Sequence, residues 1–144
     1  MSSRSQQMRR NKGRMMTDSF VRIPHHVVNH ENFRTLSCRA TKLLIDLLAQ
    51  YRGYNNGDLA ATLKMMQERG WNSSDQLQKA KNELIEKDVI IVARQGGLNK
   101  AGLYAVTFFP IDECKGKLDV ASTRTAPVNW KNRLSSPLVG VKGS

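Results

Sequence analysis

The hydrophobic pattern of residues 73–107 constrains the fold of this chain more than any other feature, because its period changes partway along. The first part repeats apolar residues at helical spacing, at Leu77, Ala80, Leu84 and Ile85. The second part contains a β-branched run over 89–94, a glycine-containing loop over 95–102 and a second strand-like run over 103–109. The segment therefore predicts a helix that leads directly into a β-hairpin.

Length and composition limit the kind of protein that can surround this segment. The chain has 144 residues, of which 40% are hydrophobic, and its mean hydropathy of -0.49 is typical of a single globular domain. Lysine and arginine number 23 against 12 acidic residues, which gives a net charge of +11 and a pI near 10.1. This charge favours a polyanionic partner, with nucleic acid as the first candidate and an anionic membrane as the second.

The membrane alternative lacks the patterns that it requires. The sequence has no apolar span of about 18 residues or more, and polar residues directly follow Met15 and Met16, where a signal peptide would be apolar. Cys38 and Cys114 do not form a CxxC pair or a disulfide framework. We therefore expect a cytoplasmic protein with no membrane partner, whose cysteines remain in a reducing compartment.

Composition divides the chain into three regions. Residues 1–19 are rich in Ser, Gln and Arg without apolar periodicity, which predicts a disordered basic arm. Residues 20–120 contain the periodic segments and are expected to form the domain. Residues 121–144 are rich in Ser, Thr, Pro and Gly, which predicts a basic flexible tail.

Two core helices are predicted before residue 73, preceded by a short edge strand or extended lead-in over 20–24 and a helical turn within 25–33. Ser37 can cap the first helix, over 36–50, and Asp58 can cap the second, which extends to about Arg69. Gly70 suits the left-handed conformation that ends a helix, and Ser73 or Ser74 can cap the third helix. The short turn between the second and third helices indicates a helix-turn-helix.

The third helix carries the side chains that such a motif would use. In a helix-turn-helix, polar residues near the N-terminus of the second helix reach base edges in the major groove of DNA. Glutamine can bond adenine in a bidentate manner, and lysine can reach a guanine edge or a phosphate. The candidates are Ser73, Ser74, Gln76, Gln78, Lys79 and Asn82. The alternative is an amphipathic helix with a solvated polar face.

Two further groups of residues are candidates for contacts with the DNA backbone. Glycines allow the hairpin loop to approach phosphates closely, and the loop's polar and cationic residues would hold them, at Arg94, Gly96, Gly97, Asn99 and Lys100. The basic arm would screen phosphates or enter a minor groove, through Arg4, Arg9, Arg10, Lys12 and Arg14. The alternatives are a hairpin with solvated charges and a solubilising terminus.

This combination resembles the winged helix-turn-helix DNA-binding family, and within it the small helix-turn-helix proteins of bacteria, phages and mobile elements. The likeness covers about residues 20–130 and is carried by residues 51–59, 69–71, 80–84, 94–97, 103–107 and 110–120. It implies an α+β fold with three helices and a small antiparallel β-hairpin or sheet, and double-stranded DNA as the partner. Likeness at the level of a fold names neither a target sequence nor a process.

Catalytic and metal-binding patterns are weak or missing. His25, His26 and His30 have spacings that could meet on one ion, but no cysteine or carboxylate pair completes such a site. The sequence has no recognisable nucleophile motif, P-loop or dinucleotide-binding glycine pattern. We therefore expect no catalytic residues, no metal site, no cofactor and no enzymatic activity.

Several functional alternatives remain open at this stage. Sequence-selective binding of double-stranded DNA would suit a transcriptional regulator or a replication-associated protein, with transcription or replication proteins as further partners. No dimerisation helix is evident, so both a monomer and a homodimer are open. From a different class, the fold could be a protein-interaction or RNA-binding module without sequence-specific DNA readout.

Overall fold

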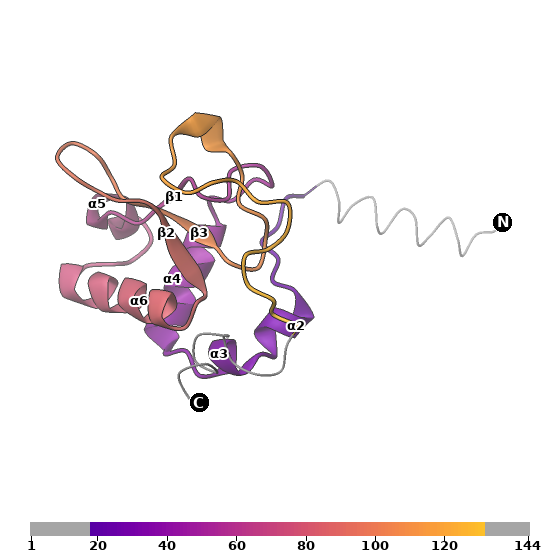
Figure 1. Ribbon diagram of the computed structural model, residues 1–144. Helices are drawn as coiled ribbons and strands as arrows, with labels where there is room; N and C mark the ends of the chain where they lie inside the picture. The colour runs from indigo at the N-terminus through magenta and orange to yellow at the C-terminus, as the bar shows by residue number, and fades with distance from the viewer. Residues whose placement is uncertain (1–17, 132–144) are drawn as a thin grey trace, which may run out of the picture.

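The computed structural model describes residues 18–131 and combines helices with one antiparallel sheet, as the expected α+β class requires (Figure 1). The strand order in the sheet is β1-β3-β2. The elements in chain order are α2 (His25–Val28), α3 (Glu31–Arg34), α4 (Cys38–Leu48), β1 (Leu59–Ala60), α5 (Leu63–Gln67), α6 (Ser74–Glu86), β2 (Ile90–Arg94), β3 (Leu103–Val106) and the 3-10 turn η1 (Cys114–Gly116).

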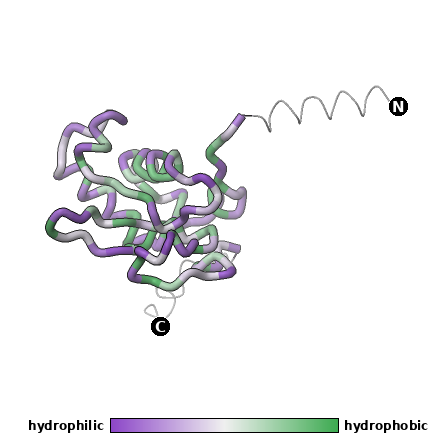
Figure 2. Tube along the Cα trace, turned by 90° about the horizontal axis from the view of Figure 1, so that it is seen from above, coloured by the Kyte–Doolittle hydropathy of each residue, from purple (hydrophilic) through white to green (hydrophobic). Residues whose placement is uncertain are grey.

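Helices α4 and α6 form the centre of the core, and both begin at predicted caps. The Ser37 hydroxyl accepts a hydrogen bond from the backbone N–H of Ala40 at 3.1 Å, and the Ser73 hydroxyl accepts one from the backbone N–H of Gln76 at 3.2 Å. The apolar stripes of the two helices are buried, at Leu77, Ala80 and Leu84 in α6 and at Ala40, Leu43, Leu44, Leu47 and Leu48 in α4. Hydrophobic stretches accordingly gather in the middle of the molecule, with hydrophilic stretches around its outline (Figure 2).

The second predicted helix is wrong in its first half. Leu59 and Ala60 form strand β1, and α5 begins only after Thr62, whose hydroxyl accepts a hydrogen bond from the Met65 amide at 3.3 Å. Tertiary pairing outweighs helical propensity here, because β1 pairs with β3 through Leu59↔Tyr104 and Ala60↔Leu103. Asp58 caps no helix and forms an ion pair with Lys117 at 2.9 Å.

The returning strand of the hairpin is shorter than expected. Strand β3 ends at Val106 rather than near Phe109, and the chain turns at the buried side chain of Asn56. The Asn56 amide nitrogen donates to the carbonyls of Val106, Phe109 and Pro110 at 2.9–3.1 Å, and its amide oxygen accepts from the Val106 amide at 2.9 Å. One buried amide thus satisfies the backbone groups at the end of the strand.

The packed domain extends past the predicted boundary at residue 120. Trp130 is 3% exposed, its indole nitrogen donates to the Thr107 hydroxyl at 3.0 Å, and its ring meets His30 edge-on with 4.9 Å between centroids. Part of the predicted tail, at Trp130, therefore packs on the core although the composition of this region is polar. The five basic residues of the arm and positions 132–144 of the tail lie outside the described residues.

Candidate nucleic-acid interface

The first turn of α6 and the β2–β3 loop project to the same side of the molecule, on the left in Figure 1. The described chain begins at residue 18 on the opposite side of the same view. Among the described residues, no helix has both the length and the apolar character needed to span a bilayer. The two groups of predicted DNA contacts, on α6 and on the β2–β3 loop, thus lie on the same side of the molecule in Figure 1.

The structure places the predicted side chains of α6 at the surface, and several of them contact each other. Apart from the capping residue Ser73, all are exposed: Ser74, Gln76, Gln78, Lys79 and Asn82. The Gln78 amide nitrogen donates to the Asn82 side-chain oxygen at 3.0 Å. Lys79 forms an ion pair with Asp75 at 3.2 Å, in which both side chains are more than half exposed. Such contacts between exposed groups are weak, so they can be exchanged for contacts with bases.

Arg39 is a functional candidate that the sequence did not reveal. It lies in the first turn of α4, and its guanidinium donates a hydrogen bond to the side-chain oxygen of Gln76. This contact orients the side-chain amide of Gln76, one of the predicted base readers. No local pattern indicates it, because the two residues are far apart in sequence and meet only when α4 packs on α6.

Lys81 is the second such candidate, and it lies where α6 packs against the sheet. Its ammonium is 5.9 Å from the centre of the Tyr104 ring, on the central strand β3. Burial lowers the pKa of Lys81 and raises the pKa of Tyr104. None of the carboxylates in residues 18–131 forms an ion pair with Lys81. A partly buried cation without an acidic partner is suited to meet an external anion such as a phosphate.

The β2–β3 loop is a narrow, internally bonded finger. Gly97 and Lys100 exchange backbone hydrogen bonds at 2.9 and 3.1 Å, so that Leu98 and Asn99 form its tip. Asn99 adopts a left-handed φ of 58°, which asparagine tolerates better than most residues. A Cβ on Gly96 would lie 2.9 Å from the Gly102 backbone nitrogen, so glycine at this position allows the two strands to converge.

The candidate residues of this loop do not all face outward. Gly96, Gly97, Asn99 and Lys100 are exposed, as contacts with a DNA backbone would require. Arg94 is half-buried, and its guanidinium donates to the Ala101 carbonyl at 2.8 Å. Its present contact therefore braces the hairpin, and its contact with a phosphate stays a prediction.

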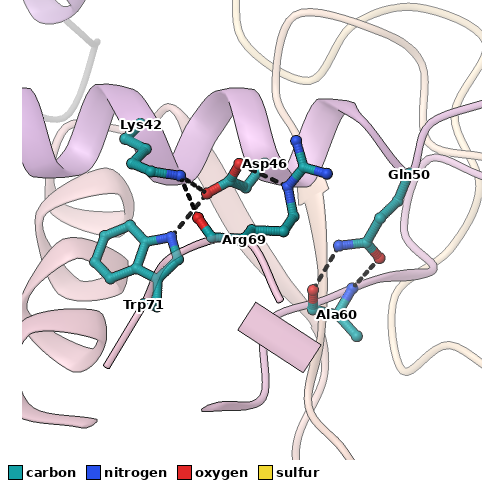
Figure 3. A network of polar contacts seen from close by, with 6 residues as sticks. All are labelled: Lys42, Asp46, Gln50, Ala60, Arg69 and Trp71. Atoms are coloured by element: carbon teal, nitrogen blue, oxygen red, sulfur yellow. Dashed lines mark hydrogen bonds and ion pairs between the residues drawn. The ribbon is translucent and has the colours of Figure 1, made fainter. Parts of the chain in front are cut away.

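A polar network holds the turn between α5 and α6 against α4 (Figure 3). The buried carboxylate of Asp46 accepts hydrogen bonds from Lys42 at 2.9 Å and from Arg69 and the Trp71 indole at 2.7 Å. Lys42 also donates to the Arg69 carbonyl at 2.7 Å. Although burial alone would raise the pKa of Asp46, hydrogen bonds from these donors lower it below its ordinary value. The network fixes the start of α6 relative to the core.

Gln50, two residues past the end of α4, continues this polar row at the same spacing of four. Its amide nitrogen donates to the Ala60 carbonyl at 2.7 Å, and its amide oxygen accepts from the Ala60 amide at 2.9 Å. The side chain therefore satisfies the free edge of β1 as a neighbouring strand would. Residues 42, 46 and 50, spaced four apart, connect one helix to both the turn and the sheet.

The predicted absence of a metal site concerns the arrangement of His, Cys, Asp and Glu side chains. Within residues 18–131, no group of three or more His, Cys, Asp or Glu side chains is placed to hold an ion. The ring of His30 instead accepts a hydrogen bond from the backbone N–H of Asn32 at 3.0 Å and caps α3.

Comparisons with protein-family models, curated proteins and solved structures found no match to this chain. Its function is therefore inferred from the arrangement of its own residues.

Proposed function

We propose that this chain is a winged helix-turn-helix protein that binds double-stranded DNA in a sequence-selective manner. The observation that carries the proposal is that the exposed polar start of α6 and the finger-like β2–β3 loop project to one side. The element order from α4 to β3 supports it, because helix, strand, two helices and a hairpin follow one another with α5 and α6 separated by a short turn.

In this proposal α6 enters the major groove and reads bases. Gln78 and Asn82 give up their mutual hydrogen bond and donate and accept at base edges, with adenine as the best bidentate partner for an amide. Arg39 holds Gln76 in position for the same purpose. Lys79 bonds a guanine edge or a phosphate.

The backbone contacts come from the other elements of the same surface. Lys100 and the glycine backbone of the loop lie against one strand of the duplex, and Lys81 meets a phosphate between the loop and α6. Helix α5 and its turn, fixed by the Asp46 network, set the angle at which α6 enters the groove. Such an activity would suit a transcriptional regulator or a replication-associated protein of a bacterium, phage or mobile element.

The proposal is tested by selecting bound duplexes from a random pool. We expect the wild-type protein to recover a motif, and the Gln78→Ala variant to change the base preferred at one position of it. The matched control is Asn29→Ala, which removes an exposed amide between α2 and α3 and should leave the motif intact. Equal binding of random duplex and structured RNA, with no recovered motif, would overturn the proposal in favour of a general interaction module.

A further inference from the structure

Leu98 is an apolar side chain at the most exposed point of the proposed DNA-binding surface. It is 93% exposed, more than any other large hydrophobic residue among those described. Its neighbours in the loop are polar, small or cationic, so no apolar patch surrounds it. A protein partner that recognised this tip would bury only one apolar side chain. Insertion between two base pairs, by contrast, requires only one such side chain, so Leu98 suits a nucleic acid better.

The tip is held in shape by contacts below it. The paired backbones of Gly97 and Lys100 close a loop of only two residues. Two hydrogen bonds hold the base of the loop on the domain. The backbone N–H of Gln95 donates to the Asp119 carboxylate at 2.9 Å, and the backbone N–H of Asp119 donates to the Ala93 carbonyl at 2.8 Å. Because the loop backbone is already ordered, the insertion of Leu98 into a partner costs little conformational entropy.

Charge favours a nucleic acid as that partner. Residues 95–102 contain Lys100 and no acidic residue. With α6 in the major groove, a hairpin beside it lies over the sugar–phosphate backbone and the adjoining minor groove. A slender finger fits the minor groove, which is only about 6 Å wide, better than a broad loop would.

We propose that the β2–β3 loop enters the minor groove and that Leu98 inserts between two adjacent base pairs, which kinks the duplex. This inference rests on the proposed function and adds a second source of selectivity to it. Pyrimidine–purine steps unstack most easily, so the preferred site should carry such a step beneath the loop, where no side chain reads the bases directly.

The experiment uses the duplex recovered in the selection, with a fluorophore at each end and 2-aminopurine at the step beneath the loop. Wild-type protein should bring the ends closer and brighten the 2-aminopurine, because the base loses its stacking partner. The Leu98→Ala variant should still bind this duplex, with affinity lower by about tenfold, and lose both signals. The Leu98→Met variant should retain them, because methionine is also an apolar wedge.

Val28→Ala is the matched control, since Val28 is an exposed apolar residue on α2, outside the proposed surface. Binding is followed by anisotropy in the same titration, so the two proposals can fail separately. Selective binding without bending or 2-aminopurine brightening, or with signals that Leu98→Ala leaves unchanged, would overturn the insertion alone. A wild-type protein that recovers no motif, or fails to bind the duplex, would overturn both.

Discussion

Among single residues, Asp46 connects the core to the proposed DNA-binding surface, and we expect its replacement to lower stability. The Asp46→Asn variant keeps the size of the side chain but cannot accept from all three donors, one of which is the buried Trp71 indole. An unsatisfied buried donor costs about 1–3 kcal/mol, and we expect a loss of unfolding free energy in this range in urea denaturation. The matched control is Asp75→Asn, whose carboxylate is 70% exposed, and it should change little.

The same residue predicts the response to acid. Because the pKa of Asp46 is lowered in the folded protein, its contribution is fully present above the ordinary value of 3.8 and is lost as pH falls through the lower folded value. Wild-type protein should therefore lose more stability than Asp46→Asn as the pH is lowered below about 4. Parallel stability curves for the two proteins across this range would contradict the proposed charge-assisted hydrogen bonds.

Lys81 is expected to serve binding at the expense of stability. Burial lowers its pKa and no described carboxylate pairs with it, so its charge destabilises the folded domain. The Lys81→Met variant should unfold at the same or a higher temperature and bind all duplexes more weakly. The slope of log affinity against log salt should become shallower by about one. Lys115→Met, on η1, is the control, and equal slopes for the two variants would contradict a phosphate contact by Lys81.

Among the secondary-structure elements, the sequence correctly predicts the helices whose first residues are determined by local chemistry. Helices α4 and α6 begin at Ser37 and Ser73 as expected, because a capping serine and a helical apolar period lie within a few residues of each other. Strand β1 has only two residues and depends on pairing with β3, so its residues read as the start of a helix. The contacts of Arg39 with Gln76 and of Lys81 with Tyr104 also require packing between distant segments.

The segment over residues 121–131 gives a direct test of where the domain ends. Trp130→Ala removes a ring packed on His30 and Phe108, and also leaves the Thr107 hydroxyl without its indole donor. We expect this variant to lose about 3–5 kcal/mol of unfolding free energy in urea denaturation. A loss of less than about 1 kcal/mol would mean that the tail begins before Trp130.

Across the whole molecule, positive charge and base-reading groups are separated along the sequence. All 12 acidic residues lie between Asp18 and Asp119, whereas the first 17 positions carry five cations and no acid. The domain that presents α6 is therefore closer to neutral than the complete chain. Attraction to DNA should depend mainly on the termini, while the choice of sequence depends on the α6 surface and on Leu98.

This separation predicts opposite effects from two changes. A protein lacking residues 1–17 should bind every duplex more weakly, and its log affinity should depend less steeply on log salt, by up to about 0.9 for each phosphate that the arm would neutralise. Its selected motif should be that of the full chain, because the amides of α6 are unchanged. Gln78→Ala should keep the salt slope and alter the motif. Anisotropy titrations at several salt concentrations and selection from a random pool measure the two properties independently. A truncated protein with a new motif and an unchanged slope would show that the arm reads bases, and that selectivity is not confined to α6 and the loop.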